Sequence, residues 1–246
     1  TPKPSSAASD VYKRQAQFGT LIHSLAQASA SGLDDANIST ALEAAWPALG
    51  IDSIWLAEQE KQRAVDAITN YAVWDAKESA TFATAGLEVG VDHIFTVDDL
   101  ADFGITTEDI ASVDATTVPV RVKGRIDRLE RTDAGQYVIV DFKTGKTVPS
   151  KKDTQDNAQL ALYQLALSGS DKDTTPVVKA KLVYLRPRSG SLGERDQQAL
   201  DADERKRWRL ALQTAASATS GPTFHACRND HCTQCVVQES LSLIHI

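Results

Sequence analysis

The sequence has no methionine, only three cysteines and few aromatic residues, which make up 6% of its 246 residues. Because no initiator methionine is present, we expect the chain to be an internal fragment of a longer protein. No apolar run approaches the roughly 20 residues that a membrane-spanning helix needs, and no signal peptide is visible. These absences argue against an integral membrane protein.

The overall composition is that of an ordinary soluble domain. Hydrophobic residues make up 42% of the chain and charged residues 24%, and the length suits one large domain or two small ones. The formal net charge of −7 does not favour a nucleic-acid binder, although net charge says nothing about local patches.

Both ends of the sequence resemble translated library-adapter sequence rather than natural protein. The stretches are "SSAASDVYKRQ" at residues 5–15 and "LSLIHI" at residues 241–246. We therefore expect residues 1–15 and 241–246 to be non-native and exclude them from the prediction of the fold. A single domain at residues 16–240 remains.

The order of predicted elements indicates an α/β domain with a mixed sheet. Residues 18–30 and most of residues 37–82 have a helical apolar period. Residues 98–117 are acidic, rich in threonine and poor in large apolar side chains, which predicts a loop or insertion. The remaining elements are a strand at 87–97, a strand pair at 118–131 and 136–143, a helix at 157–167, a strand at 177–190 and a helix at 201–218.

The strand pair is predicted to bring two aspartates together. Its segments flank "TDAG", where the glycine suits a backbone position with positive φ. A hairpin folded at Ala134 sets Asp127 opposite Asp141, since both are equidistant from residue 134, and such partners have Cβ atoms about 4.5–5.5 Å apart. Lys143 shares a face with Asp141, because side chains two residues apart on a strand point the same way. A slip of one residue would break this arrangement.

Two carboxylates and an ammonium group at one place suit a divalent cation and phosphate chemistry. Mg²⁺ takes one or two carboxylates, keeps several waters and accepts oxygens from a phosphate. A lysine beside such an ion can position or deprotonate a water, or stabilise charge on the phosphate. The alternative is a surface hairpin in which Asp141 and Lys143 form an exposed ion pair of little energetic value.

Further motifs around the hairpin match a known family. "GRIDRLE" followed by "VIVDFKTGK" resembles the RecB-like branch of the PD-(D/E)XK nucleases, which implies a restriction-endonuclease-like core with a mixed central sheet flanked by helices. The pattern has a glycine and an aspartate on one strand, D-x-K-T-G ending the next, Q-x-x-x-Y on the following helix, and G-x-x-x-H on an upstream helix. The matching residues are Gly19, His23, Gly124, Asp127, Asp141, Lys143, Thr144, Gly145, Gln159 and Tyr163.

The resemblance implies a metal site. His23, Asp127 and Asp141 would ligate Mg²⁺ or Mn²⁺, with the carbonyl of Phe142 as a further ligand. Glu88 loosely matches an acidic residue that some members carry on the first core strand. Taken alone, a histidine in the apolar surroundings of His23 is more often a core residue than a ligand.

The resemblance also implies the remaining catalytic groups. Lys143 would be the catalytic lysine, and Gln159 and Tyr163, one helical turn apart on one face, would contact the active site or the DNA backbone. Taken alone, Gln159 and Tyr163 could equally bound a buried helix face.

Basic residues cluster around these segments and predict a positively charged surface that binds the phosphates of a nucleic-acid strand. The alternative is an ordinary set of solvated charges at strand ends. The basic residues are Lys123, Arg125, Arg128, Lys143, Lys146, Lys151, Lys152, Arg186 and Arg188. The four tryptophans, in contrast, are predicted to be packing residues: Trp46, Trp55, Trp74 and Trp208.

The function implied by the resemblance is a Mg²⁺-dependent DNA exonuclease or endonuclease, placed in the cytoplasm. Such domains often belong to helicase–nucleases that process DNA ends during double-strand break repair and recombination. The partners would be single- or double-stranded DNA ends, a helicase domain in cis and a helicase–nuclease partner subunit. The alternatives are a stand-alone CRISPR-associated RecB-like exonuclease, a non-catalytic DNA-binding or scaffolding module, and a hydrolase of another phosphodiester.

The cysteines lie in "FHACRNDHCTQC" near the end of the chain. Cys232 and Cys235 have the C-x-x-C spacing of zinc or iron–sulfur ligands, with two unrelated thiols as the alternative. Because some RecB-like members carry a four-iron cluster that joins the ends of the domain, the resemblance implies a [4Fe–4S] cluster in the intact parent protein. Cys227 breaks the spacing and would be a bystander.

Overall fold

The computed structural model of the chain describes residues 4–51, 53–169, 175–186 and 192–220. Three helices precede the sheet: α1 (Pro4–Ala30), α2 (Asp35–Ala45) and α3 (Ile54–Glu78). A short 3₁₀ helix, η1 (Trp46–Leu49), separates α2 from α3. The predicted helical regions are therefore present, with η1 as an interruption between α2 and α3.

A mixed sheet forms the centre of the molecule, as the sequence predicted, and it has five strands rather than the four expected. In chain order its strands are β1 (Ala83–Phe95), β2 (Val120–Arg131), β3 (Tyr137–Lys143), β4 (Val177–Tyr184) and β5 (Gly193–Gln198). The spatial order is the same, β1-β2-β3-β4-β5. The β3–β4 pair is parallel and the other three pairs are antiparallel.

Two helices connect the parallel strands β3 and β4, as such a pair requires. They are α5 (Lys151–Gln155) and α6 (Ala158–Ser168), and the last helix of the described chain is α7 (Ala202–Ser220). Asp201 caps the start of α7, since its Oδ1 accepts a hydrogen bond of 2.8 Å from the Glu204 N–H. That bond satisfies one of the free donors at a helix start.

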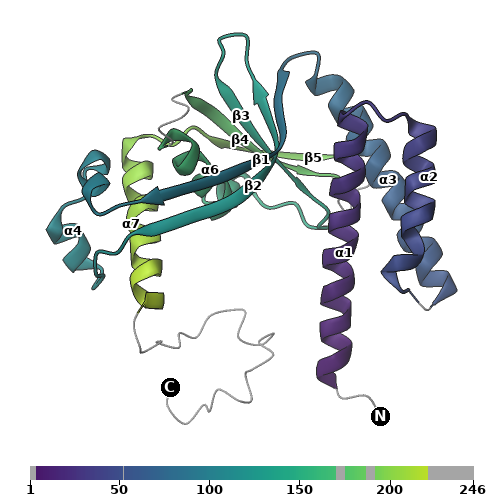
Figure 1. Cartoon of the computed structure of the whole chain (residues 1–246), viewed down its shortest axis with the longest axis horizontal. Coiled ribbons are helices and arrows are strands. Elements are labelled where there is room, and N and C mark those ends of the chain that lie inside the picture. Colours follow the sequence, from purple (N-terminus) through teal and green to yellow (C-terminus); the bar gives the residue numbers. More distant parts are fainter. Residues whose placement is uncertain (1–3, 52, 170–174, 187–191, 221–246) are drawn as a thin grey trace.

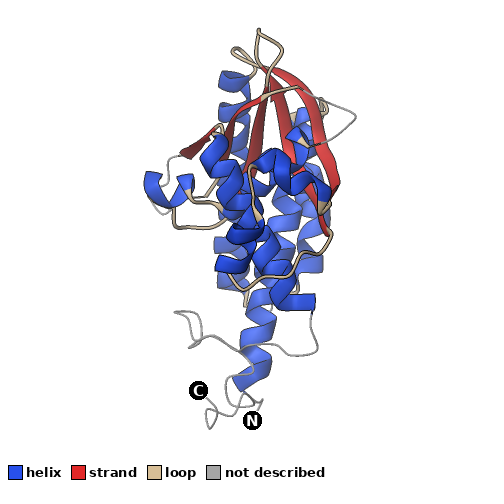
Figure 2. Ribbon diagram, turned by 90° about the vertical axis from the view of Figure 1, so that its left-hand side faces the viewer, coloured by secondary structure: helices blue, strands red, loops and turns tan. Residues whose placement is uncertain are grey.

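The sheet separates two hydrophobic cores. Figures 1 and 2 show the helices that cover its two faces. Alternate residues of β3 point to opposite sides: Val138, Val140 and Phe142 pack with α1–α3, whereas Tyr137 and Ile139 pack on the side of α6. β3 is therefore buried on both faces up to Phe142, which explains its nearly continuous apolar sequence.

The predicted hairpin is confirmed in register and in the positive φ of its turn glycine. β2 and β3 pair from Arg131↔Tyr137 to Arg128↔Val140, and residue numbers in each pair sum as predicted for a turn centred at residue 134. Gly135 has a φ of 81°, a left-handed conformation that a glycine adopts without strain.

The prediction of a loop at residues 98–117 was wrong. The segment contains a 3₁₀ helix, η2 (Asp98–Phe103), and a helix, α4 (Thr107–Ser112). Thr106 and Asp109 form a reciprocal capping box at the start of α4, and such caps stabilise helices too short to show a clear period. Leu100, Ile105 and Ile110 form a small separate core, so few apolar residues sufficed.

The strand β5 was not predicted, because its sequence "GERDQQ" is polar. It pairs with β4 along its whole length at the edge of the sheet. Gln197, on this strand, is fully buried, and its amide donates to the carbonyls of Gln155 and Asn157, each at 3.0 Å. Within the described ranges, no helix combines the length and the apolar character needed to cross a membrane.

Candidate active site

The hairpin places Asp127 where the two strands part. The last paired residues of β2 and β3 are Arg128 and Val140, so Asp127 and Asp141 come next in register. The N–H of Phe142 donates to Asp127 Oδ2 at 2.7 Å. A side-chain carboxylate thus replaces the backbone acceptor that the neighbouring strand would otherwise supply, and it holds Asp127 close to the end of β3.

Helix α1 brings His23 to this carboxylate. His23 Nδ1 lies 3.3 Å from Asp127 Oδ1, and its ring contacts Phe142 edge-on with centroids 6.4 Å apart. Gly19 lies one turn earlier, where an added Cβ would be 3.4 Å from Thr144 Oγ1. This ordinary contact distance shows that α1 packs against the loop after β3, one turn before His23.

Glu88 approaches the same point from β1. Its neighbours Leu87 and Val89 pair with β2 on either side of Asp127, whereas Glu88 itself has a φ of 50°. A left-handed glutamate is uncommon and conformationally costly, which often marks a functional position. One ligand atom each from His23, Glu88 and Asp127 fall within 4.8 Å of one another, beside a cavity of about 10 Å³ that all three line.

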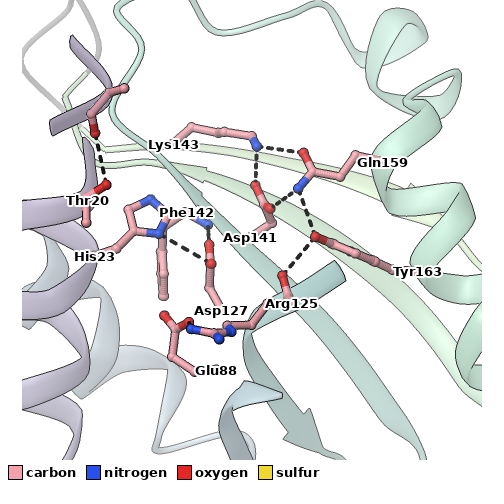
Figure 3. A network of polar contacts seen from close by, with 11 residues as sticks. Thr20, His23, Glu88, Arg125, Asp127, Asp141, Phe142, Lys143, Gln159 and Tyr163 are labelled. Carbon is pink, nitrogen blue, oxygen red and sulfur yellow. Dashed lines mark hydrogen bonds and ion pairs between the residues drawn. The ribbon is translucent and has the colours of Figure 1, made fainter. Parts of the chain in front are cut away.

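Asp141 forms the second half of the site with Lys143 and Gln159 (Figure 3). Lys143 Nζ lies 2.6 Å from Asp141 Oδ2 and donates to Gln159 Oε1 at 2.8 Å. Gln159 Nε2 in turn donates to Asp141 Oδ1 at 2.6 Å. These three contacts form a closed ring, and the ring fixes the direction in which the lysine ammonium points.

Tyr163 connects this ring to β2. Its hydroxyl lies 3.3 Å from Gln159 Nε2 and donates to the carbonyl of Arg125 at 2.8 Å. A Cβ added to Gly124 would stand only 2.8 Å from Tyr163 Cε1. The glycine of the sequence motif is thus the residue that leaves room for the tyrosine. The sequence did not reveal the contact with Arg125, because it is made by the main-chain carbonyl and not by the side chain.

Comparison with known proteins shows the family of the chain. The family model of the PD-(D/E)XK nuclease superfamily matches residues 5–240. The chain belongs to this superfamily. No curated protein matches the chain. Among solved structures, one titled "Crystal structure of SSO0001" is similar, with 14% sequence identity, 89% of this chain and 93% of that chain covered, and a TM-score of 0.39.

Superfamily members are generally nucleases, and the carboxyl of Asp141 at this candidate site has a strongly shifted pKa. Burial raises the pKa of Asp141 to about 6, Lys143 acts against that rise, and the charge of Asp127 adds to it. A carboxyl whose pKa departs this far from its ordinary value, beside a specific charge partner, is typical of functional sites.

His23 responds to the same charges. Burial alone would lower its pKa, but the hydrogen bond to Asp127 and the charges of Asp127, Asp141 and Glu88 outweigh burial and raise it. The imidazole therefore senses three carboxylates at once. A bound cation, which repels a proton on this ring, would compete directly with protonation.

Two sequence predictions about side chains outside the site were wrong. Arg128 is not part of a phosphate-tracking surface: it is buried against the Trp74 ring and ion-paired with Asp75 and Glu130. Trp55 is not a packing residue, since it is 71% exposed. Arg188, Cys227, Cys232 and Cys235 lie outside the described residues, so the predicted cluster stays a prediction.

Proposed function

We propose that this PD-(D/E)XK superfamily member is a metal-dependent deoxyribonuclease domain of the RecB-like branch. The observation that carries the proposal is that ligand atoms of His23, Glu88 and Asp127 lie within 4.8 Å of one another, with Asp141 on the next strand held by the Lys143 ammonium. Acids so close together repel one another unless a cation is present, and a lysine held next to such a cation is suited to phosphodiester hydrolysis.

The ion is proposed to be Mg²⁺ or Mn²⁺, held by His23, Glu88 and Asp127, with Asp141 and the Phe142 carbonyl as further ligands. Carboxylate and carbonyl oxygens suit both ions. The closeness of three ligand atoms beside a cavity of about 10 Å³, roughly the room of one water molecule, supports this fit. When bound, the ion would supply Lewis-acid stabilisation of charge on the phosphate.

The residues of the chain would supply orientation and charge. In the proposed reaction a water oxygen bonds to phosphorus while one ester bond breaks, and the departing oxygen receives a proton. Lys143 would stabilise the negative charge that grows on the phosphate, because preorganised donors stabilise developing charge better than water does. Gln159, held by Tyr163, would keep the ammonium in place during the step.

The more specific features of the proposal rest on the RecB-like sequence motifs. They are exonuclease action on DNA ends, a helicase domain in cis, a helicase–nuclease partner subunit and a role in break repair. A [4Fe–4S] cluster on Cys232 and Cys235 would belong to the parent protein, since thiolates at this spacing suit iron–sulfur ligation. Anaerobic expression of that parent, with iron and sulfide analysis, tests the cluster.

Degradation of linear DNA tests the proposal directly. The purified chain should cleave it with Mg²⁺ or Mn²⁺ and stop with EDTA, and Asp141→Ala and Lys143→Ala should each lower the rate at least 100-fold. Asp133→Ala, at an exposed turn position of the same hairpin, is the matched control and should retain full activity. A folded chain that binds DNA but never cleaves it would favour the non-catalytic module instead.

A further inference from the structure

A cavity of about 520 Å³ lies beside the candidate active site. Its walls come from α1, η1, Ile51, the start of α3 and the loop that follows Lys143, and they include Arg14 and Gln15 of the stretch whose sequence resembles an adapter. The side chains used below are Phe18, Leu49, Ile51, Leu56, Lys146 and Arg186. This volume falls within the range of roughly 300–1,000 Å³ that is usual for small-molecule sites.

The walls combine an apolar surface with a few fixed polar groups. Leu49 and Ile51 contribute aliphatic surface, and the Arg186 guanidinium lies over the Phe18 ring with its Cζ 4.6 Å from the centroid. Arg186 Nη1 donates to Glu60 Oε2 at 3.1 Å, so its orientation is fixed. Phe18 is buried beneath Arg186, so the surface open to a ligand is the guanidinium and the aliphatic side chains. A flat, partly apolar ligand with hydrogen-bonding edges suits such walls, because it can stack on a guanidinium plane.

The rim of the cavity carries a cation. Lys146 is exposed and lines the cavity together with Thr144 and Gly145, and within the described ranges no carboxylate pairs with it. A ligand with an apolar flat body and an attached anion would therefore satisfy both the walls and the rim. A nucleotide unit of a DNA strand has this chemistry.

The position of the cavity relates it to the reaction. Lys146 follows the catalytic candidate Lys143 by three residues, and Phe18 precedes His23 by five residues on α1, a rise of about 7.5 Å along a helix. Thr144 lines the cavity and follows Lys143 directly, and a Cβ added to Gly19, one turn before His23, would be 3.4 Å from Thr144 Oγ1. The cavity therefore borders the loop and the helix that carry Lys143 and His23.

We propose that the cavity is a nucleobase-binding subsite, which takes one base of the substrate strand next to the phosphate that is cleaved. The inference rests on the proposed nuclease function and adds a base contact to it. Stacking contributes similarly for every base, so the subsite would fix the register of the strand rather than select a sequence.

A series of oligothymidylates, each with one abasic site at a different position, tests the subsite. Binding is measured by fluorescence anisotropy in buffer with Ca²⁺ and no Mg²⁺, and cleavage sites are mapped separately with Mg²⁺. One abasic position, adjacent to the main cleavage site, should weaken binding roughly tenfold, the loss expected for one stacked base. The other positions should have little effect.

Cavity-filling variants separate this subsite from other base contacts. Leu56→Trp and Ile51→Trp should abolish the difference between intact and abasic strands, while Val65→Trp, which enlarges a side chain in a groove elsewhere on α3, should preserve it. Equal binding at all abasic positions, or a difference that survives both filling variants, would overturn the subsite and leave the nuclease proposal intact. A wild-type chain that neither binds nor cleaves DNA would overturn both.

Discussion

Asp127 accepts a hydrogen bond of 2.7 Å from the main-chain N–H of Phe142 on the neighbouring strand. Its other carboxylate oxygen lies 3.3 Å from His23 Nδ1. One side chain thus joins the end of β3 to helix α1, so its structural and chemical roles can be separated by substitution.

Asp127→Asn and Asp127→Ala should differ in stability but not in activity. An asparagine oxygen can still accept from Phe142, so Asp127→Asn should unfold within about 1 kcal/mol of the wild type, whereas Asp127→Ala leaves the N–H unpaired and should cost about 1–3 kcal/mol. Both lose a metal-binding charge and should lose DNA cleavage and the rise in melting temperature caused by Mn²⁺. An asparagine variant that keeps the Mn²⁺-dependent rise would contradict the metal assignment.

Gly124→Ala should slow cleavage by displacing Tyr163. The added Cβ would stand 2.8 Å from Tyr163 Cε1, so the ring must move and Gln159 loses its support. We expect kcat to fall about tenfold, with little further loss when Tyr163→Phe is added, because contacting residues do not contribute additively. The matched control is Gly90→Ala on β1, where no atom lies within 4 Å of the added Cβ. If both alanine variants behave alike, the role given to Gly124 is wrong.

The Asp141 carboxyl should titrate unusually high in the metal-free protein. Its pKa is raised to about 6, chiefly by burial, and Lys143 opposes the rise. Lys143→Ala should therefore raise the pKa of Asp141 further, and the charged fraction of this group should fall as the pH drops through 6. Carboxyl-carbon NMR measures both effects, with Asp92, whose pKa is lowered by Arg121, as the internal reference. An Asp141 signal that titrates with Asp92 would refute the prediction.

Glu130 should make the fold less stable as the pH rises. Burial raises its pKa to about 7, although Arg128 acts in the opposite direction. Between about pH 4.5 and 7 the folded chain holds a proton that the unfolded chain has lost, so the free energy of unfolding falls by up to roughly 3 kcal/mol across this window. Glu130→Gln should lack this slope. Urea unfolding at pH 5, 6, 7 and 8 checks it, and parallel curves for both proteins would count against the assignment.

The hairpin and the fold class were predictable because their signals are local. The register of β2 and β3 follows from a short turn with Gly135, and the burial of β3 on both faces follows from its apolar run. The proximity of His23 to Asp127 was of another kind. The two residues are far apart in the sequence, so only the resemblance to a family suggested it.

Other features depended on tertiary contacts that the sequence does not express. The left-handed backbone at Glu88 arises from the pairing of β1 around it, so the sequence alone supported only a loose match. The polar strand β5 was not predicted, because buried amides such as Gln197 count as polar residues and give no apolar alternation. Arg128 was misassigned because the sequence does not distinguish an arginine that forms ion pairs in the core from one at the surface.

The polar sequence of β5 has a consequence for association between molecules. It closes one side of the described sheet, and Glu194, Arg195 and Asp196 stand in succession along it. An exposed edge of apolar residues would offer a template for a strand of another copy, with aggregation as the result, whereas adjacent charges disfavour such pairing. The strand that the sequence did not predict is thus also the one that disfavours pairing of this edge of the sheet with a strand of another molecule.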